Sequence, residues 1–297
     1  MTRLVTLVSG LGWHVQDLLR ASKSVGVFLD PVPFPTLNGT IGAGADRVEA
    51  GDALDLTRVD GVLVRMMPPG SLEQVVFRMD ALHRLEAAGV PLLNAPRAVE
   101  VAVDKYLATA RLSAAGLPVP ATWAGETSES AMAAFEAFGG DVVLKPLFGS
   151  EGRGLVRLQE PEVARRVFAA IERIGSVLYV QKYVRHPGYD IRVFVLAGRV
   201  LGAMKRHAPA GDWRTNVAVG GRPERVSLSG AQTDLAIRAA AAVGASMAGV
   251  DLLHDPAIDG DVVLEVNAVP GWKALAAATG VDVAAALLDH LKGEARR

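Results

Sequence analysis

Short apolar runs alternate with amphipathic stretches through the first 97 residues of the chain. The runs with the length of buried strands are LVTLVSG, SVGVFLD, DGVLVRMM and VPLLN. The stretches between them, HVQDLLRAS and SLEQVVFRMDALHRLEAAG, place apolar residues at helical spacing. Strands that alternate with helices favour a parallel sheet. We therefore predict a parallel α/β domain over residues 1–97, with an irregular surface loop made of PVPFPT (31–36) and the glycines at 39, 42 and 44.

The pattern changes in the rest of the chain. RAVEVAVDKYLATARLSAAG is expected to form one helix that ends at Gly116, because two prolines follow it closely. DVVLKP and LVRL, joined by GSEGRG, predict an antiparallel hairpin. DIRVFVLAGRVLGAMKRHA predicts another, with its turn at Ala197 and Gly198. Hairpins mixed with helices indicate an α+β domain over residues 98–297, and hence two domains.

Composition excludes several classes of protein. The net charge is −1, which gives no electrostatic support for binding nucleic acid or an anionic membrane. The chain has no cysteine, so disulfides, thiolate zinc sites and cysteine nucleophiles are excluded. The longest apolar run, residues 239–250, is shorter than the roughly 20 residues that span a bilayer. We expect a soluble, cytoplasmic protein.

Three polar residues interrupt two otherwise apolar strands, GVDLLHD and DVVLEVNAVPG. Glu265 and Asn267 are two apart on the second strand, so their side chains point to the same face. Asp251 on the first strand would face them across a hairpin. Carboxylate and amide oxygens suit Mg²⁺, and a carboxylate among apolar neighbours is costly unless it is paired or binds a metal. The alternative is a half-exposed edge strand with its charges in water.

KPLFGSEGRG (145–154) places a lysine before a loop with three glycines. In the familiar phosphate loop, Lys and Ser/Thr follow the last glycine, whereas Leu155 and Val156 follow it here. A lysine ammonium can sit between phosphate oxygens, and glycines let backbone N–H groups approach a phosphate. The stretch is therefore either a phosphate site on a hairpin or an ordinary hairpin turn with a lysine that reaches into solvent.

Residues 190–221 hold another polar cluster. Asp190 and Arg192 share one face of a strand. The other members are Lys205, Arg206, Arg214 and Asn216. Arginine suits bidentate recognition of carboxylate or phosphate, and the alternative is a solvated basic face. Lys105, at a helix start, and Arg65, at the end of the strand VLVR, are further candidates. For each of these two, the alternative is an ordinary surface residue.

The order of these pieces is specific. A helix lysine precedes a strand lysine with its glycine hairpin, and VQKYV, DIRVFV, RTN, an aspartate and EVNAVPG follow. This order resembles the ATP-grasp superfamily, and within it the RimK-like amino-acid ligases, over about residues 98–291. EVNAVPG and DWRTN, the latter followed by a glycine pair, are the most specific parts. The resemblance implies an ATP-grasp fold over 98–297, preceded by a pre-ATP-grasp α/β domain over 1–97. Residues 98–180 would be its central and lid part, and residues 181–297 its C-terminal part with the metal site.

The resemblance also implies roles for single residues. Those that would contact ATP are Lys105, Lys145, Gly149, Ser150, Gly152, Gly154, Gln181, Lys182, Tyr183, Val184, Asp190, Arg214, Thr215 and Asn216. The two lysines would hold phosphates, the backbone of residues 182–184 would bind adenine, and Asp190 would lie beside the ribose. The ligands of Mg²⁺ or Mn²⁺ would be Asp251, Glu265 and Asn267. Arg206 and Arg214 would be catalytic. The candidates for substrate contact are Arg192, Lys205, Arg206 and Asn216, with Arg65 from the first domain.

Two positions depart from the family pattern. Lys182 stands where an acid often follows the glutamine, which leaves a backbone contact intact but weakens any side-chain role. Lys205 stands where an acid often precedes the arginine, and this leaves the substrate open.

The reaction that the resemblance implies is an ATP-dependent amide ligation. The γ-phosphoryl group of ATP passes to a carboxylate, an amine attacks the acyl phosphate, and ADP and phosphate are released. The glycine hairpin would be a lid that excludes water. The added amino acid would be L-glutamate, by family analogy, and the acceptor a pterin-type cofactor, a carrier protein or a ribosomal protein. The alternatives are an ATP-grasp ligase of the D-alanine–D-alanine or glutathione type, and a nucleotide-binding regulatory protein without catalysis. We also expect a homo-oligomer.

Overall fold

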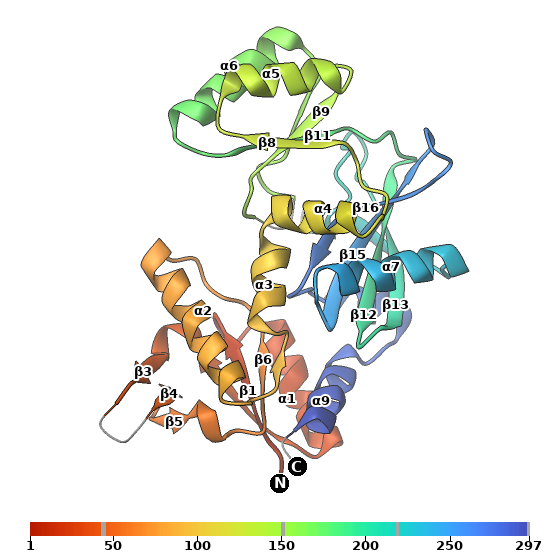
Figure 1. Cartoon of the computed structure of the whole chain (residues 1–297). Coiled ribbons are helices and arrows are strands. Elements are labelled where there is room, and N and C mark those ends of the chain that lie inside the picture. Colours follow the sequence, from red (N-terminus) through yellow and green to blue (C-terminus); the bar gives the residue numbers. More distant parts are fainter. Residues whose placement is uncertain (43–45, 150–151, 218–219, 296–297) are drawn as a thin grey trace.

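The first part of the chain forms a parallel sheet, as predicted (Figure 1). The computed structural model describes residues 1–42, 46–149, 152–217 and 220–295. The strands, in the order β2-β1-β6-β7, are β1 (Arg3–Val8), β2 (Phe28–Pro33), β6 (Gly61–Val64) and β7 (Leu92–Leu93). All of their pairings are parallel. Helix α1 (Trp13–Val25) covers one face and α2 (Leu72–Ala87) the other, which confirms the α/β prediction.

The C-terminal helix packs on this first sheet. Helices α8 (Lys273–Thr279) and α9 (Val283–Glu294) share a core with α1 and β1. A Cβ atom on Gly61 would lie 2.9 Å from Leu291 Cγ, so the glycine in β6 lets α9 approach closely. In the described residues no single helix is long and apolar enough to cross a membrane. Only the pair α8 and α9, bent by 110°, passes that test on length and composition.

Residues 31–40 do not form the irregular surface loop that we predicted, and Gly44 lies outside the described residues. Strand β2 continues to Pro33, and the 3-10 turn η1 (Phe34–Thr36) follows it. Phe34 is buried in the core below α2, because an aromatic ring gains more from packing than from solvent. The chain then builds a small antiparallel sheet from β3 (Asn38–Thr40), β4 (Arg47–Ala50) and β5 (Leu54–Asp55), and the turn η2 (Leu56–Arg58) follows.

The predicted helix over residues 97–116 is two helices. α3 (Pro96–Val103) and α4 (Lys105–Ala114) meet at Asp104. The Asp104 carboxylate accepts a hydrogen bond from the N–H of Leu107 (3.0 Å) and so caps α4. Because of this break, Lys105 is the first residue of α4. α3 spans the predicted domain boundary near residue 97, which stays a prediction.

Two antiparallel sheets follow. The four-stranded sheet, in the order β10-β9-β11-β8, consists of β8 (Thr122–Gly125), β9 (Val142–Lys145), β10 (Val156–Leu158) and β11 (Leu178–Lys182). Helices α5 (Ser128–Ala137) and α6 (Pro161–Arg173) cover it at the top of Figure 1. The pairing of β9 with β10 confirms the predicted hairpin at the glycine loop.

The five-stranded sheet has two different faces. Its strands, in the order β14-β13-β12-β15-β16, are β12 (Tyr189–Leu196), β13 (Arg199–His207), β14 (Arg222–Arg225), β15 (Met247–Asp255) and β16 (Gly260–Asn267). One face packs on α3, α4 and α7 (Gly230–Ala242). On the other face, Phe194 and Met247 pack toward α8 and α9. The polar residues Asp190 and Asp251 alternate onto this same face, farther along their strands.

Candidate active site

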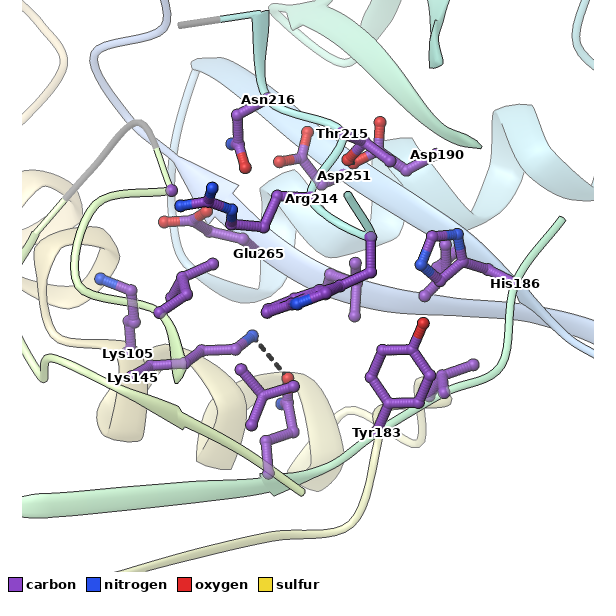
Figure 2. A pocket seen from close by; sticks show the side chains of 18 of the residues that line it. Lys105, Lys145, Tyr183, His186, Asp190, Arg214, Thr215, Asn216, Asp251 and Glu265 are labelled. Atoms are coloured by element: carbon purple, nitrogen blue, oxygen red, sulfur yellow. Dashed lines mark hydrogen bonds between the residues drawn. The ribbon is translucent and has the colours of Figure 1, made fainter. Parts of the chain in front are cut away.

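A pocket lies between the four-stranded and the five-stranded sheets (Figure 2). The pocket is open, and its empty space of about 940 Å³ includes solvent at the mouth. The predicted site residues that line it are Lys105, Lys145, Gly149, Gly152, Gln181, Lys182, Tyr183, Val184, Asp190, Arg206, Arg214, Thr215, Asn216, Asp251 and Glu265. The described candidates outside its wall are Arg65, Gly154, Arg192, Lys205 and Asn267. Ser150 lies outside the described residues.

Lys145 enters the pocket from the last position of β9. Its Nζ donates to Gln181 Oε1 (2.6 Å), and Gln181 in turn donates to Thr122 Oγ1 (3.0 Å). Burial lowers the pKa of Lys145 to about 8, although the carboxylate of Glu265 acts in the opposite direction. The ammonium is therefore held in place by a neutral amide, and its charge is left for a ligand.

The glycine hairpin reaches across to other candidates. Lys105 Nζ donates to the carbonyl of Gly149 (2.7 Å). A Cβ atom on Gly152 would lie 2.6 Å from Asn216 Oδ1, and the φ of Gly152 is +72°. The backbone conformation therefore favours glycine, and a side chain at this position would displace the amide of Asn216. These contacts join the hairpin tip to α4 and to the segment at Asn216.

The opposite wall contains a buried network of ion pairs. Arg206 Nε donates to Asp190 Oδ1 (2.7 Å), and Arg206 Nη2 lies 2.8 Å from Asp251 Oδ2. Arg192 also pairs with Asp251 through both Nε and Nη2. Burial alone would raise the pKa of Asp251, but Arg192 and Arg206 lower it below its usual value. Burial likewise opposes the charge of Arg206, but Asp251 and Asp190 raise its pKa. Two cations and two anions thus balance inside this wall.

The network includes two residues for which we predicted roles at the ligand. Thr215 Oγ1 donates to Asp190 Oδ2 (2.7 Å), and Arg206 contacts both oxygens of the same carboxylate. Asp190 is therefore part of the network, and its contact with a ribose stays a prediction. Arg206 lines the pocket but is balanced by two carboxylates. Its catalytic role stays a prediction.

Asp251 and Glu265 face each other, as predicted. They are direct partners in the pairing of β15 with β16, beside an irregularity between Asp251 and Leu252. The described residues hold no group of three His, Asp or Glu side chains suited to a metal. The predicted set has only two such side chains, Asp251 and Glu265, because its third member is the amide of Asn267. Arg192 and Arg206 occupy about three of the four lone-pair positions of Asp251. The Asn267 amide oxygen accepts from the N–H of Val269 (2.8 Å). Carboxylate and amide oxygens are the donors that Mg²⁺ prefers, so the set fits by its chemistry. Glu265, which lines the pocket and is partly exposed, is its most open member.

Aromatic residues form the other end of the pocket. The ring of Tyr183 meets Trp213 edge-on at 5.9 Å, and the His186 ring lies 5.9 Å away on another side. His186 Nδ1 is buried and has no hydrogen-bond partner in the part of the chain that the structure describes. Sequence reasoning missed His186 and Trp213. The available signal was an aromatic residue inside DWRTN and a histidine four residues before DIRVFV.

The predicted adenine-binding backbone is partly engaged. The N–H of Lys182 donates to the Ala121 carbonyl (2.8 Å), and the N–H of Tyr183 donates to the Asp141 carbonyl (2.9 Å). These two amides hold β11 in its sheet. Lys182, Tyr183 and Val184 all line the pocket, and the adenine contact through their backbone stays a prediction.

Arg214 is a cation in the pocket wall whose side chain stays partly exposed. Its side chain retains 32% of its accessible surface and pairs with Asp212 (2.7 Å). The Arg214 guanidinium lowers the pKa of Asp212 to about 2. Figure 2 shows Arg214 beside Glu265, above Lys105 and Lys145.

A model of the RimK-like ATP-grasp domain matches residues 102–291. The chain belongs to the RimK-like ATP-grasp family. A tetrahydromethanopterin:alpha-L-glutamate ligase of Methanosarcina acetivorans is 33% identical, and the match covers 94% of this chain and 95% of that protein. A ligase of the same name from Methanococcus maripaludis is 35% identical over 73% of this chain and 74% of its own length. This RimK-like protein is therefore an ATP-dependent carboxylate–amine ligase.

Solved structures agree with the fold of this RimK-like ligase. The ATP-grasp ligase PsnB, bound to a minimal precursor, superposes with a TM-score of 0.79 at 24% identity, over 99% of both chains. A RimK-domain ATP-grasp protein of Sphaerobacter thermophilus has a TM-score of 0.74 at 21% identity, over the full length of both. These likenesses confirm the predicted ATP-grasp fold.

Three predicted substrate contacts of the RimK-like ligase lie away from its pocket. Arg65 is only 3% exposed, donates to the Pro270 carbonyl (2.9 Å) and lies over the Trp272 ring (4.6 Å). Such a side chain is closed to a substrate, so the prediction for Arg65 is corrected. Arg192 is committed to Asp251. Lys205 points away from its neighbour Arg206 and lies over a tyrosine ring at 4.3 Å.

Proposed function

We propose that this ligase adds L-glutamate to the carboxylate of a pterin-type acceptor through an acyl phosphate. The observation that carries the proposal is the convergence of Lys145, Lys105 and Arg214 with Glu265 at one end of a pocket whose other end is aromatic. Two lysines and an arginine match a triphosphate, and an aromatic end matches a base. The relative named as a tetrahydromethanopterin ligase matches nearly the whole chain, including the first domain. This favours a pterin over a carrier protein or a ribosomal protein.

The chemistry would proceed in two steps. An oxygen of the acceptor carboxylate bonds to the γ-phosphorus, and the bond from that phosphorus to the β–γ bridging oxygen breaks to release ADP. The amine nitrogen of glutamate then bonds to the carbonyl carbon and loses a proton to solvent, while inorganic phosphate leaves. Lys145 and Lys105 would hold the phosphate chain, and Arg214 would stabilise charge on the transferred group.

The metal would be held by Glu265 and Asn267, with the remaining lone pair of Asp251. Mg²⁺, or Mn²⁺ in its place, neutralises the β- and γ-phosphates when it is bound. The buried network keeps Asp251 ionised, because Arg192 and Arg206 lower its pKa. The glycine hairpin would cover the nucleotide, and the contact between Lys105 and Gly149 supports such a closed position.

The nucleoside would lie at the aromatic end. Tyr183 and Trp213 would flank the base, and the free Nδ1 of His186 would accept a hydrogen bond from a ribose hydroxyl. We favour this contact over the one predicted for Asp190, because Arg206 and Thr215 bond the oxygens of that carboxylate.

A mass-gain assay tests the proposal. Purified protein with ATP, Mg²⁺, glutamate and a pterin-type acceptor should release ADP and add one glutamyl residue to the acceptor. The same mixture with a ribosomal protein or a carrier protein should give no gain. A gain with another amino acid and none with glutamate would overturn the glutamate assignment. Nucleotide binding without turnover for any pair would favour a regulatory protein. Size-exclusion chromatography with light scattering tests the predicted homo-oligomer separately.

A further inference from the structure

Residues 265–272 run from the pocket to the first domain, and first-domain side chains hold them on the way. Asn94 is fully buried, and its Nδ2 donates to the carbonyls of Ala268 (2.6 Å) and Met247 (2.7 Å). Its Oδ1 accepts from the N–H of Met247 (2.8 Å). Met247 begins β15, and Ala268 directly follows β16. One amide therefore fastens the ends of the two strands that carry Asp251 and Glu265.

The next contacts lie farther along the segment. Arg65 donates to the Pro270 carbonyl (2.9 Å) and lies over the Trp272 ring. The N–H of Trp272 donates to His14 Nε2 (3.1 Å), and its ring N–H donates to Asp17 (2.8 Å). Burial and the neighbouring Arg65 lower the pKa of His14 to about 4. The imidazole is therefore neutral at pH 7 and able to accept this bond.

Burying the charged side chain of Arg65 is unfavourable if its only role is to fill space. Burial lowers its pKa to about 10, so it still carries its charge at neutral pH. Its contacts in the described structure are a carbonyl and an aromatic face, whereas the buried Arg206 has two carboxylates. An uncompensated buried charge is costly, and an apolar side chain would fill the space without that cost. The role of Arg65 that packing does not explain is the position in which it holds Pro270.

Pro270 connects this anchor to the pocket. A Cβ atom on Gly249 would lie 2.8 Å from Pro270 Cβ and 3.0 Å from Arg192 Nη1. Pro270 thus packs on the backbone of β15 beside Arg192, the partner of Asp251. A shift of Pro270 would be passed to the side chains on both strands, because packed groups leave no free space to absorb it.

We infer that the first domain positions the metal-binding segment of the ligase, with Arg65 and Asn94 as its positioning residues. The inference rests on the proposed function, because it takes Glu265 and Asn267 as metal ligands. Neither positioning residue lines the pocket. Their effect would be to fix where Glu265 and Asn267 present their oxygens.

The chain supplies a matched control for Arg65. Arg78 is also a buried arginine of the first domain, and its Nη1 donates to a backbone carbonyl, that of Pro68 (2.8 Å). It does not contact residues 265–272 in any described hydrogen bond. Arg65→Met and Arg78→Met remove the same charge and the same kind of bond, and only the first releases Pro270.

The test measures Mn²⁺ binding by electron paramagnetic resonance in the presence of ADP, so it does not depend on turnover. Arg65→Met should weaken Mn²⁺ binding at least tenfold, while ADP affinity measured in EDTA changes less than twofold. Arg65→Lys should recover part of the loss, and Arg78→Met should bind Mn²⁺ like the wild type. Circular dichroism checks that each variant is folded, and Asn94→Ser, expected to weaken Mn²⁺ binding about three- to tenfold, replaces Arg65→Met if that variant is not.

The outcomes separate the two proposals. If the wild type binds no Mn²⁺ with ADP, the proposed metal site fails, and with it the proposed function. If the wild type binds Mn²⁺ but the Arg65 and Arg78 variants behave alike, the proposed function stands and the positioning role is overturned.

Discussion

The two walls of the pocket treat charge in opposite ways. On the wall of the five-stranded sheet, Arg206 and Arg192 are balanced by Asp190 and Asp251, and all four side chains are largely buried. On the wall of the four-stranded sheet, Lys145 is held by the neutral amide of Gln181, and burial lowers its pKa to about 8. The first wall has its charges satisfied within the protein. The second has a cation that gains its full partner only when an anion binds.

This difference separates stability from ligand binding. A balanced buried network is rigid, and removing one member leaves its partner uncompensated. An unbalanced cation lowers the stability of the empty protein, and an anionic ligand restores that stability by supplying the missing counter-charge. The same pocket therefore predicts large stability effects on one wall and large activity effects with small stability effects on the other.

The largest expected effect is on the stability of the balanced wall. Arg206→Met leaves the buried carboxylates of Asp190 and Asp251 short of a counter-charge, so the free energy of unfolding should fall by about 3–5 kcal/mol. Urea denaturation followed by circular dichroism measures this fall. Lys205→Met is the control, because Lys205 is the neighbour on the same strand and lies over a tyrosine ring. It should change the free energy by less than about 1 kcal/mol. Equal losses for the two variants would refute the buried network.

Glu265 gives the matching test for a charged side chain that lies on the five-stranded sheet but outside its balanced ion pairs. Glu265→Gln keeps the shape but removes the carboxylate that is partly exposed in the pocket. ADP formation should fall at least about a hundredfold, as is typical when a group that stabilises transferring charge is removed. Unfolding by urea should change by less than about 1 kcal/mol, since no buried network loses its balance. The two readouts are a coupled ADP assay and the urea midpoint. A large drop in stability with full activity would show that Glu265 supports the fold and does not act on a ligand.

Much of this division was visible in the sequence, because strand periodicity fixes which side chains share a face. Asp251 and Glu265 were predicted to face each other, and they are register partners. Lys145 was placed at the end of a strand before a glycine hairpin, and it lies there. The break at Asp104 was hidden, because an N-cap aspartate inside an apolar helical pattern looks like any exposed helix residue.

The sequence could not predict which arginine pairs with which aspartate. Periodicity put Asp190 and Arg192 on one face, but it does not say that Arg192 bonds Asp251 while Asp190 bonds Arg206. Those partners depend on the order of strands β13-β12-β15, which is a property of the sheet and not of any one segment. For the same reason Arg65 was taken for a substrate contact. Its partner Pro270 lies 205 residues away in the chain.

The pH dependence of nucleotide binding tests the unbalanced lysine. Burial lowers the pKa of Lys145 from the ordinary 10.5 to about 8, so the folded protein releases this proton more readily than the unfolded chain does. Between pH 8 and pH 10.5 the empty protein should therefore gain stability from this group as the pH rises. Nucleotide needs the charged form, so ADP affinity should fall about tenfold between pH 7 and pH 9. Calorimetry over this range measures the fall. Lys145→Arg, which stays charged, should flatten the profile, and an equally steep profile in that variant would assign the titration to another group.

The smallest expected effect is at the aromatic end. His186 Nδ1 is buried without a partner in the described residues, so a ribose hydroxyl that donates to it should contribute about 0.5–1.5 kcal/mol, or about two- to tenfold in affinity. The wild type should bind 2′-deoxy-ATP or 3′-deoxy-ATP less tightly than ATP by this factor, and the sugar position that matters identifies the hydroxyl. His186→Phe should bind ATP as weakly as the wild type binds that deoxy analogue, and it should lose the discrimination between the two nucleotides. If His186→Phe still discriminates between the two nucleotides, the ribose contacts another group. Lys145 would then be the main nucleotide contact that supports the contrast between the two walls.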